Sequence, residues 1–152
     1  MSKVHDNWYL ASYPHDDSVL PKEIKEQIAN KQKILVLVDL TCEHPRQVTS
    51  CSYYINVPSW DGHAPSLEDM KRAMFVFNTI RHKEGDDKII VLVHCAFGKG
   101  RSTMFLCALM VECGLFPTWL EAFEHVKKHR SIAHLGYEFR SQLDHWKEFN
   151  KK

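Results

Sequence analysis

The segment that decides the fold reads IIVLVHCAFGKGRSTMFLCALMV and covers residues 89–111. It opens with residues 89–93, an apolar and largely β-branched run that is typical of a buried strand. It closes with residues 103–111, which are apolar almost throughout and predict a helix buried on all sides. The turn between them, residues 95–100, contains two glycines. A buried strand that leads through a tight turn into a buried helix is typical of an α/β fold.

The rest of the chain alternates between strand-like and helix-like segments in the same way. The expected strands cover residues 8–11, 34–38 and 53–57, and the expected helices cover 21–30, begin at Ser66 and Thr118, and cover 137–149. Because repeats and Pro/Gly-rich linkers are absent, we expect residues 1–152 to form a single domain. The alternation predicts a three-layer α/β sandwich, with a central, mostly parallel sheet and helices on both faces.

The composition excludes several classes of protein. The net charge of +1 gives no reason to expect a nucleic-acid partner, and the basic run of residues 127–130 is expected to be a solvated helix face. No apolar stretch is long enough to span a membrane, and none near the N-terminus resembles a signal peptide. Five cysteines without a Cys-x-x-Cys pair favour neither a disulfide framework nor structural zinc. We therefore expect a monomer in the reducing cytoplasm.

A metal site is not expected either. His125 and His129 are spaced like two zinc ligands on one helix face, but the sequence offers no evident third ligand. An exposed helix face is the simpler interpretation of this pair.

The turn of residues 95–100 has the properties of a phosphate-binding nest. A tight loop that enters a helix directs several backbone N–H groups into one concavity, and the helix dipole adds a positive field. Gly98 and Gly100 allow the backbone to turn and to approach an anion closely. Arg101 can add a planar, two-pronged contact to two phosphate oxygens.

The same positive field predicts a reactive sulfur at Cys95. A free thiol titrates near pH 8.5, and a helix N-terminus or a neighbouring cation favours its ionised form. Cys95 would then be a thiolate nucleophile below the bound phosphate. His94 is expected to hold the loop by hydrogen bonds, with its side chain directed away from the substrate. The competing interpretations are a Walker A loop, which the sequence Gly-Lys-Gly-Arg does not fit, and an unreactive cysteine beside a structural turn.

The stretch HCAFGKGRS, from His94 to Ser102, resembles the His-Cys-x5-Arg-Ser/Thr signature of protein tyrosine phosphatases and dual-specificity phosphatases. The resemblance extends over most of the chain, whose length is similar to that of the small dual-specificity type. It implies an α/β sandwich, a phosphocysteine intermediate, and neither a metal nor another cofactor. It also implies that the substrate phosphate is bound by Ala96, Phe97, Gly98, Lys99, Gly100 and Arg101.

The resemblance implies two further catalytic residues beside Cys95 and Arg101. The leaving group needs a proton, and Asp61 is the expected general acid because it lies in a loop between a strand and a helix. That loop, residues 58–65, is similar to the acid loop of the phosphatases of regenerating liver. Ser102 is expected to donate a hydrogen bond to the Cys95 sulfur. The alternatives are an ordinary Asp-Gly turn and a simple helix-start serine, and Gln142 is left outside the site.

Two classes of function remain open at this point. The first is a phosphomonoester hydrolase, most simply a protein tyrosine or dual-specificity phosphatase that acts on phosphotyrosine and phosphoserine or phosphothreonine in a phosphoprotein. Lys99 is similar to a loop lysine of a phosphoinositide phosphatase, so a phosphoinositide substrate is an alternative, although Ala96 replaces that enzyme's second lysine. The second class is a non-catalytic module that reads phosphate. Retention of the four expected catalytic residues favours the enzyme.

Overall fold

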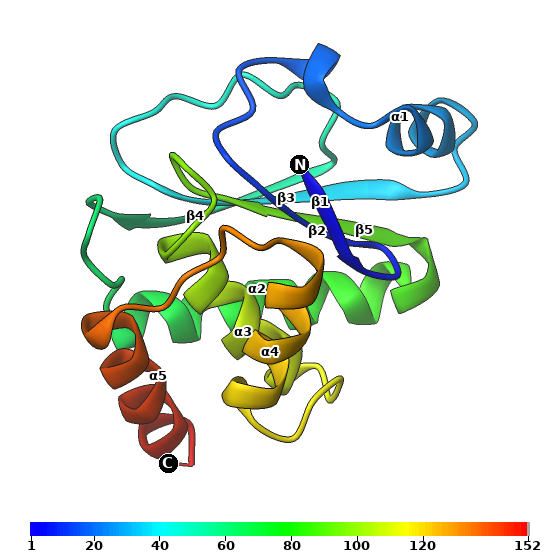
Figure 1. The fold of residues 1–152 in the computed structure, drawn as a ribbon. Coiled ribbons are helices and arrows are strands. Elements are labelled where there is room, and N and C mark those ends of the chain that lie inside the picture. Colours follow the sequence, from blue (N-terminus) through cyan, green and yellow to red (C-terminus); the bar gives the residue numbers. More distant parts are fainter. Residues whose placement is uncertain (152) are drawn as a thin grey trace.

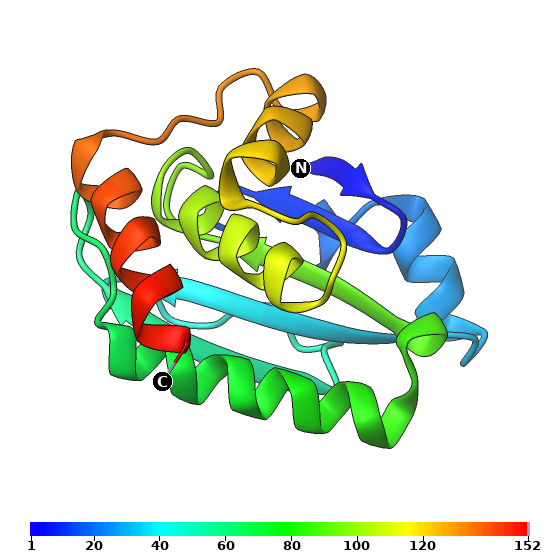
Figure 2. The same cartoon turned by 90° about the horizontal axis from the view of Figure 1, so that it is seen from below.

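The computed structural model describes residues 1–151 of the chain. A five-stranded sheet lies between one helix on one face and four helices on the other (Figures 1 and 2). The strands are β1 (Ser2–His5), β2 (Trp8–Ala11), β3 (Ile34–Thr41), β4 (Tyr53–Ser59) and β5 (Ile89–His94). The helices are α1 (Lys22–Ala29), α2 (Leu67–Glu84), α3 (Arg101–Glu112), α4 (Trp119–His129) and α5 (Tyr137–Asn150). Asp17–Val19 and Asp86–Lys88 form short 3₁₀ helices.

The sheet is mostly parallel, and the predicted three-layer arrangement is confirmed. Its strand order is β1-β2-β5-β3-β4, in which only the pair β1 and β2 is antiparallel. β1 was not predicted from the sequence, because its four residues of mixed polarity carry too little pattern to identify a strand. The turn that follows it contains Asn7 in the left-handed region, at φ 67°, a conformation that asparagine tolerates better than most residues.

Two of the predicted helix starts can be recognised by their caps. The Ser66 hydroxyl accepts a hydrogen bond from the Asp69 amide at 3.1 Å, and the Thr118 hydroxyl accepts one from the Glu121 amide at 3.2 Å. Each cap satisfies an amide that the helix itself leaves unpaired.

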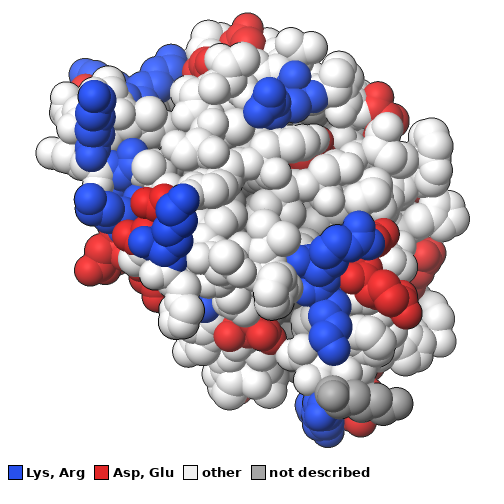
Figure 3. Space-filling model, turned by 180° about the vertical axis from the view of Figure 1, so that it is seen from behind, with Lys and Arg blue, Asp and Glu red and all other residues white. Residues whose placement is uncertain are grey.

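Charges of both signs are mixed on the face of the molecule that Figure 3 shows. Lys and Arg side chains lie beside Asp and Glu side chains in clusters around an uncharged central area. This face therefore presents no broad surface of a single charge. No helix within residues 1–151 is both long enough and apolar enough to cross a membrane.

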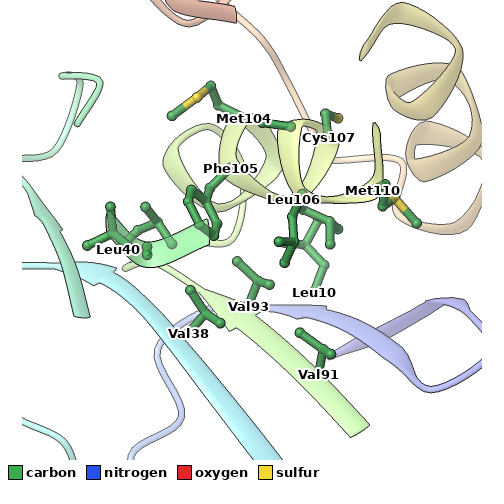
Figure 4. Close-up of a cluster of buried hydrophobic side chains, with 14 of the residues drawn as sticks. Leu10, Val38, Leu40, Val91, Val93, Met104, Phe105, Leu106, Cys107 and Met110 are labelled. Atoms are coloured by element: carbon green, nitrogen blue, oxygen red, sulfur yellow. The ribbon is translucent and has the colours of Figure 1, made fainter. Parts of the chain in front are cut away.

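Alternate side chains of the central strands pack on opposite sides of the sheet. On β3, Leu35 and Leu37 belong to the core beneath α1, whereas Val36, Val38 and Leu40 belong to the larger core beneath the other helices. Figure 4 shows α3 lying over this second core, where it contributes Met104, Phe105, Leu106, Cys107 and Met110. Every residue of α3 from its first to its tenth is buried, which confirms the predicted central helix.

The parallel strands all end at one edge of the sheet. Ala11 of β2 and Asp39 of β3 both pair in register with His94 at the end of β5. The chain segments that follow β2, β3, β4 and β5 therefore begin close together. In open α/β sheets, ligands bind beyond the carboxyl ends of the strands, so this edge is where a site is expected.

Candidate active site

The turn between β5 and α3 encloses the sulfur of Cys95. Only 3% of Cys95 is exposed. The amide of Gly98 donates a hydrogen bond to the sulfur at 3.2 Å, and the Ser102 hydroxyl lies 3.2 Å from it. The turn therefore surrounds the sulfur with groups that can donate hydrogen bonds to it.

Glycine is required at two positions of this turn because neighbouring groups come very close. Gly98 has φ +67°, and a Cβ atom there would lie 2.6 Å from the backbone carbon of Ala11 and 2.6 Å from Nη2 of Arg130. A Cβ atom on Gly100 would lie 2.7 Å from the Phe139 ring. The predicted role of the glycines is thus joined by a packing constraint that involves three distant segments, at Ala11, Arg130 and Phe139.

The carboxylate of Glu43 holds Arg101 in place. It is 2% exposed. Its two terminal nitrogens donate to Glu43 at 2.9 and 2.8 Å, and Nη1 also donates to the carbonyl of Ser59 at 2.6 Å. Nε is buried and has no partner within residues 1–151. The guanidinium is therefore fixed in orientation, and its Nε–H group is left for a substrate oxygen.

The ion pair also determines the charge state of Glu43. The hydrogen bonds from Arg101 lower the pKa of this carboxyl to about 2, against the smaller opposing effect of burial. Glu43 is thus a carboxylate at any pH at which the protein would work, and Arg101 keeps a partner for its charge.

Asp61 lies at the mouth of the same turn. Its Oδ1 atom is 3.8 Å from Nη2 of Arg101, and its side chain is largely exposed. The loop that carries it is attached to α5 at two points: Ala64 donates its amide to Glu138 at 3.1 Å, and Gln142 donates to the carbonyl of Pro65 at 2.7 Å. The side-chain amide of Gln142 therefore supports the loop of Asp61.

His94 is buried behind the turn. Its Nδ1 atom lies 3.5 Å from the carbonyl of Cys95, and its Nε2 atom lies 3.7 Å from Asp39. Asp39 is itself buried and accepts hydrogen bonds from Thr41 and Tyr54. Burial lowers the pKa of His94, while the charge of Asp39 opposes that change. The loop-supporting role of His94 stays a prediction.

Sequence reasoning missed two charged residues of this site. Glu43 follows β3, whose end lies beside the end of β5, so its position along the chain was a usable signal. Arg130 gave no such signal, and the expectation that residues 127–130 form a solvated face is wrong for this residue. It is 8% exposed and donates to the carbonyl of Gly98 at 2.9 Å. Its partners lie far away in the sequence, so the charge pattern of the helix could not reveal them.

Comparison with known proteins decides the family. A model of the catalytic domain of dual-specificity phosphatases matches residues 19–149. The chain belongs to this family. The predicted resemblance is thereby confirmed.

Relatives and solved structures agree with this assignment. "Probable protein tyrosine phosphatase type IVA B" of Dictyostelium discoideum is 30% identical over 73 residues, which are 48% of this chain and 44% of that protein. Dual specificity protein phosphatase 5 of Rattus norvegicus is 27% identical over 111 residues, 72% of this chain and 28% of that protein. The matches thus span less than half of each relative's length.

Two solved human structures share the fold of this dual-specificity phosphatase domain. DUSP28 superposes with a TM-score of 0.76 at 21% identity, over 99% of this chain and 98% of that one. A tyrosine phosphatase-like serine/threonine/tyrosine-interacting protein superposes with a TM-score of 0.74 at 18% identity, over 100% and 98%.

Replacing Glu43 by Gln should lower the free energy of unfolding at neutral pH, because it leaves the buried Arg101 charge without a carboxylate. It should also change the pH dependence of stability. The pKa of Glu43 is about 2 in the folded protein and 4.5 ordinarily. Its stabilising contribution is therefore complete above about pH 4.5 and is lost as the pH falls toward 2.

Urea unfolding between pH 7 and pH 3 measures this difference. Wild type should lose more stability below pH 4.5 than Glu43→Gln does. Glu124→Gln, on the exposed side of α4, is the matched control and should follow wild type. Parallel pH curves for wild type and Glu43→Gln would contradict the interpretation of the ion pair.

Proposed function

We propose that this dual-specificity phosphatase domain hydrolyses phosphomonoesters through a phosphocysteine intermediate, with residues 1–152 acting as a single catalytic domain. The observation that carries the proposal is the enclosed sulfur of Cys95, which lies within hydrogen-bonding distance of Gly98 and Ser102 at the start of a buried helix. Membership of the family supports the same chemistry.

In the first step the substrate phosphate lies in the nest of residues 96–101. The backbone amides and the free Nε of Arg101 bind its non-bridging oxygens. The Cys95 thiolate attacks phosphorus, so that an S–P bond forms while the bond to the leaving oxygen breaks. Asp61, at the mouth of the nest, gives its proton to that oxygen.

In the second step water attacks the phosphocysteine. Asp61, now a carboxylate, takes the proton of the water, and a new P–O bond forms as the S–P bond breaks. Ser102 lies 3.2 Å from the sulfur and can donate its hydroxyl proton in a hydrogen bond to the departing thiolate. Inorganic phosphate then leaves, and the thiolate is restored for another cycle.

The rim of the site supports a protein substrate that carries apolar residues beside the phosphate. Four large apolar side chains there are strongly exposed: Trp60 (66%), Phe97 (62%), Ile132 (48%) and Tyr137 (87%). Trp60 comes from the loop of Asp61, Phe97 from the nest itself, Ile132 from the segment that links α4 to α5, and Tyr137 is the first residue of α5. Exposed apolar side chains around a site can supply contact surface to a bound molecule.

A phosphoinositide substrate is the second candidate, and Lys99 is the observation that favours it. Lys99 is exposed within the nest and could attract a second phosphate. An inositide with several phosphates would need several cations, whereas the apolar rim offers binding energy to a less charged substrate. We therefore favour a phosphoprotein over a phosphoinositide.

Location and assembly stay predictions. All five cysteines are free thiols, which agrees with a reducing cytoplasm. A monomer is expected, and light scattering of the purified protein would test it. The alternative of a non-catalytic phosphate-reading module is tested by the first of the following experiments.

Cys95→Ser should abolish turnover of p-nitrophenyl phosphate, because a serine hydroxyl stays protonated where a thiolate does not. Vanadate or phosphate should still bind, since the nest remains. Cys42→Ser, which changes an exposed cysteine, is the control and should retain activity. Turnover in Cys95→Ser above about one per cent of wild type would show that another group attacks phosphorus.

Asp61→Asn should lower kcat by roughly 10²–10⁴, the usual contribution of general acid catalysis. The alkaline limb of the pH–rate profile should flatten, and the loss should shrink for substrates whose leaving group needs no proton. Asp87→Asn, before β5, is the control and should match wild type. If the pH–rate profile of Asp61→Asn is unchanged, the acid must be sought elsewhere.

Trp60→Ala and Lys99→Ala separate the two substrate classes. If the substrate is a phosphoprotein, Trp60→Ala should lower kcat/KM for a phosphopeptide with apolar neighbours about tenfold more than for p-nitrophenyl phosphate. Phe75→Ala, an equally exposed position on α2, should have no such effect. A selective loss on a bisphosphorylated inositide in Lys99→Ala, with no effect of Trp60→Ala, would favour the phosphoinositide instead.

A further inference from the structure

Arg130, at the end of α4, reaches into the turn that holds Cys95. Its Nε atom donates to the carbonyl of Gly98 at 2.9 Å, and its Nη2 atom lies 3.4 Å from the carbonyl of Phe97. The remaining terminal nitrogen, Nη1, donates to the hydroxyl of Ser2 at 3.0 Å. One buried side chain thus connects α4, β1 and two consecutive carbonyls of the nest.

Because the peptide group is planar, the contacts of Arg130 with the carbonyls of Phe97 and Gly98 also affect the direction of the amides that follow them. In a trans peptide the C=O and the N–H of the next residue point in opposite directions. Arg130 holds the carbonyl of Phe97 on one side, and on the other side the amide of Gly98 donates to the Cys95 sulfur at 3.2 Å. By the same geometry, holding the carbonyl of Gly98 turns the amide of Lys99 in the opposite direction.

The charge of Arg130 is also unusual. All of its hydrogen-bond partners are neutral, and none of the ion pairs within residues 1–151 includes it. Buried charges are ordinarily paired. Burial lowers the pKa of Arg130, and the charge of Cys95 opposes that change. An anion in the nest would supply the counter-charge that the protein itself does not.

We infer that Arg130 is a positioning residue of the phosphate nest. It holds the carbonyls of Phe97 and Gly98 away from the bound phosphate, so that the following amides face inward, and its charge favours the thiolate of Cys95. The inference rests on the proposed function in that Cys95 is taken as the nucleophile. Arg101 differs from Arg130 because Arg101 is neutralised by Glu43 and keeps a donor for the substrate.

Other ionisable groups around these residues belong to several elements. The Met1 α-amino group has its pKa lowered by burial and by Arg130. His94 of β5 directly precedes Cys95, Arg101 is the first residue of α3, and Asp61 lies 3.8 Å from Arg101 at the mouth of the nest. These groups are present in the Arg130 variant and in its control alike, so a difference in Cys95 reactivity between the two variants can be assigned to Arg130.

The test compares Arg130→Met with Arg140→Met. Arg140 lies in the next helix and also donates to a backbone carbonyl, that of Leu135 at 2.8 Å, but it does not contact the nest. The readout is the rate at which iodoacetamide alkylates Cys95 as a function of pH, followed by mass spectrometry of the peptide that contains it. This readout needs no turnover.

In Arg130→Met the midpoint of alkylation should move about one pH unit upward, as expected when a nearby opposite charge is lost. The value of kcat/KM should fall about tenfold or more, since a misplaced nest costs that much. Arg140→Met should keep the wild-type midpoint. Equal midpoints for the two variants would overturn the inference.

Arg130→Lys keeps the charge but cannot contact both carbonyls in the same way. Its alkylation midpoint should stay near wild type while kcat/KM falls, and an unchanged kcat/KM would overturn the positioning role. If Arg130→Met shows no cooperative thermal unfolding, the kcat/KM of Arg130→Lys decides whether Arg130 positions the nest. Failure of the proposed function would appear separately, as turnover in Cys95→Ser.

Discussion

The sulfur of Cys95 lies almost out of contact with water, 3.2 Å from the amide nitrogen of Gly98 and 3.2 Å from the Ser102 hydroxyl. Enclosing a sulfur in this way requires the chain to turn tightly between β5 and α3 with its amides directed inward. A peptide group that points its N–H inward must point its C=O outward, so the outward carbonyls need partners of their own. The surrounding elements supply these partners, and the site depends on them.

Two buried arginines lie at this turn, and only Arg130 binds its carbonyls. Arg101 is paired with Glu43, which costs desolvation of two charges but fixes the guanidinium in one orientation. Arg130 has neutral partners and supports the nest from the end of α4. Removal of Glu43 leaves the buried charge of Arg101 without a carboxylate, whereas the charge of Arg130 is compensated only when the nest holds an anion.

Much of the architecture could be predicted, because it follows from local patterns. The alternation of strand-like and helix-like segments indicated a mostly parallel sheet, and the caps at Ser66 and Thr118 marked two helix starts. The hairpin strand β1 was not predicted, because its four residues take their strand conformation from pairing with β2. The short basic run that ends at Arg130 was interpreted as solvated, since its spacing is that of any exposed helix face.

The sequence by itself determined the turn and the functional groups that it carries: a cysteine, two glycines, an arginine and a serine lie within one short segment that leads from a strand into a helix, and residues of one segment keep their spacing in any fold. Only the tertiary structure decided what surrounds that turn. Glu43, Asp61 and Arg130 reach it from three other segments, because parallel strands end at one edge of the sheet and α4 ends beside it. Which distant side chains meet there depends on strand order and register, which no local pattern encodes.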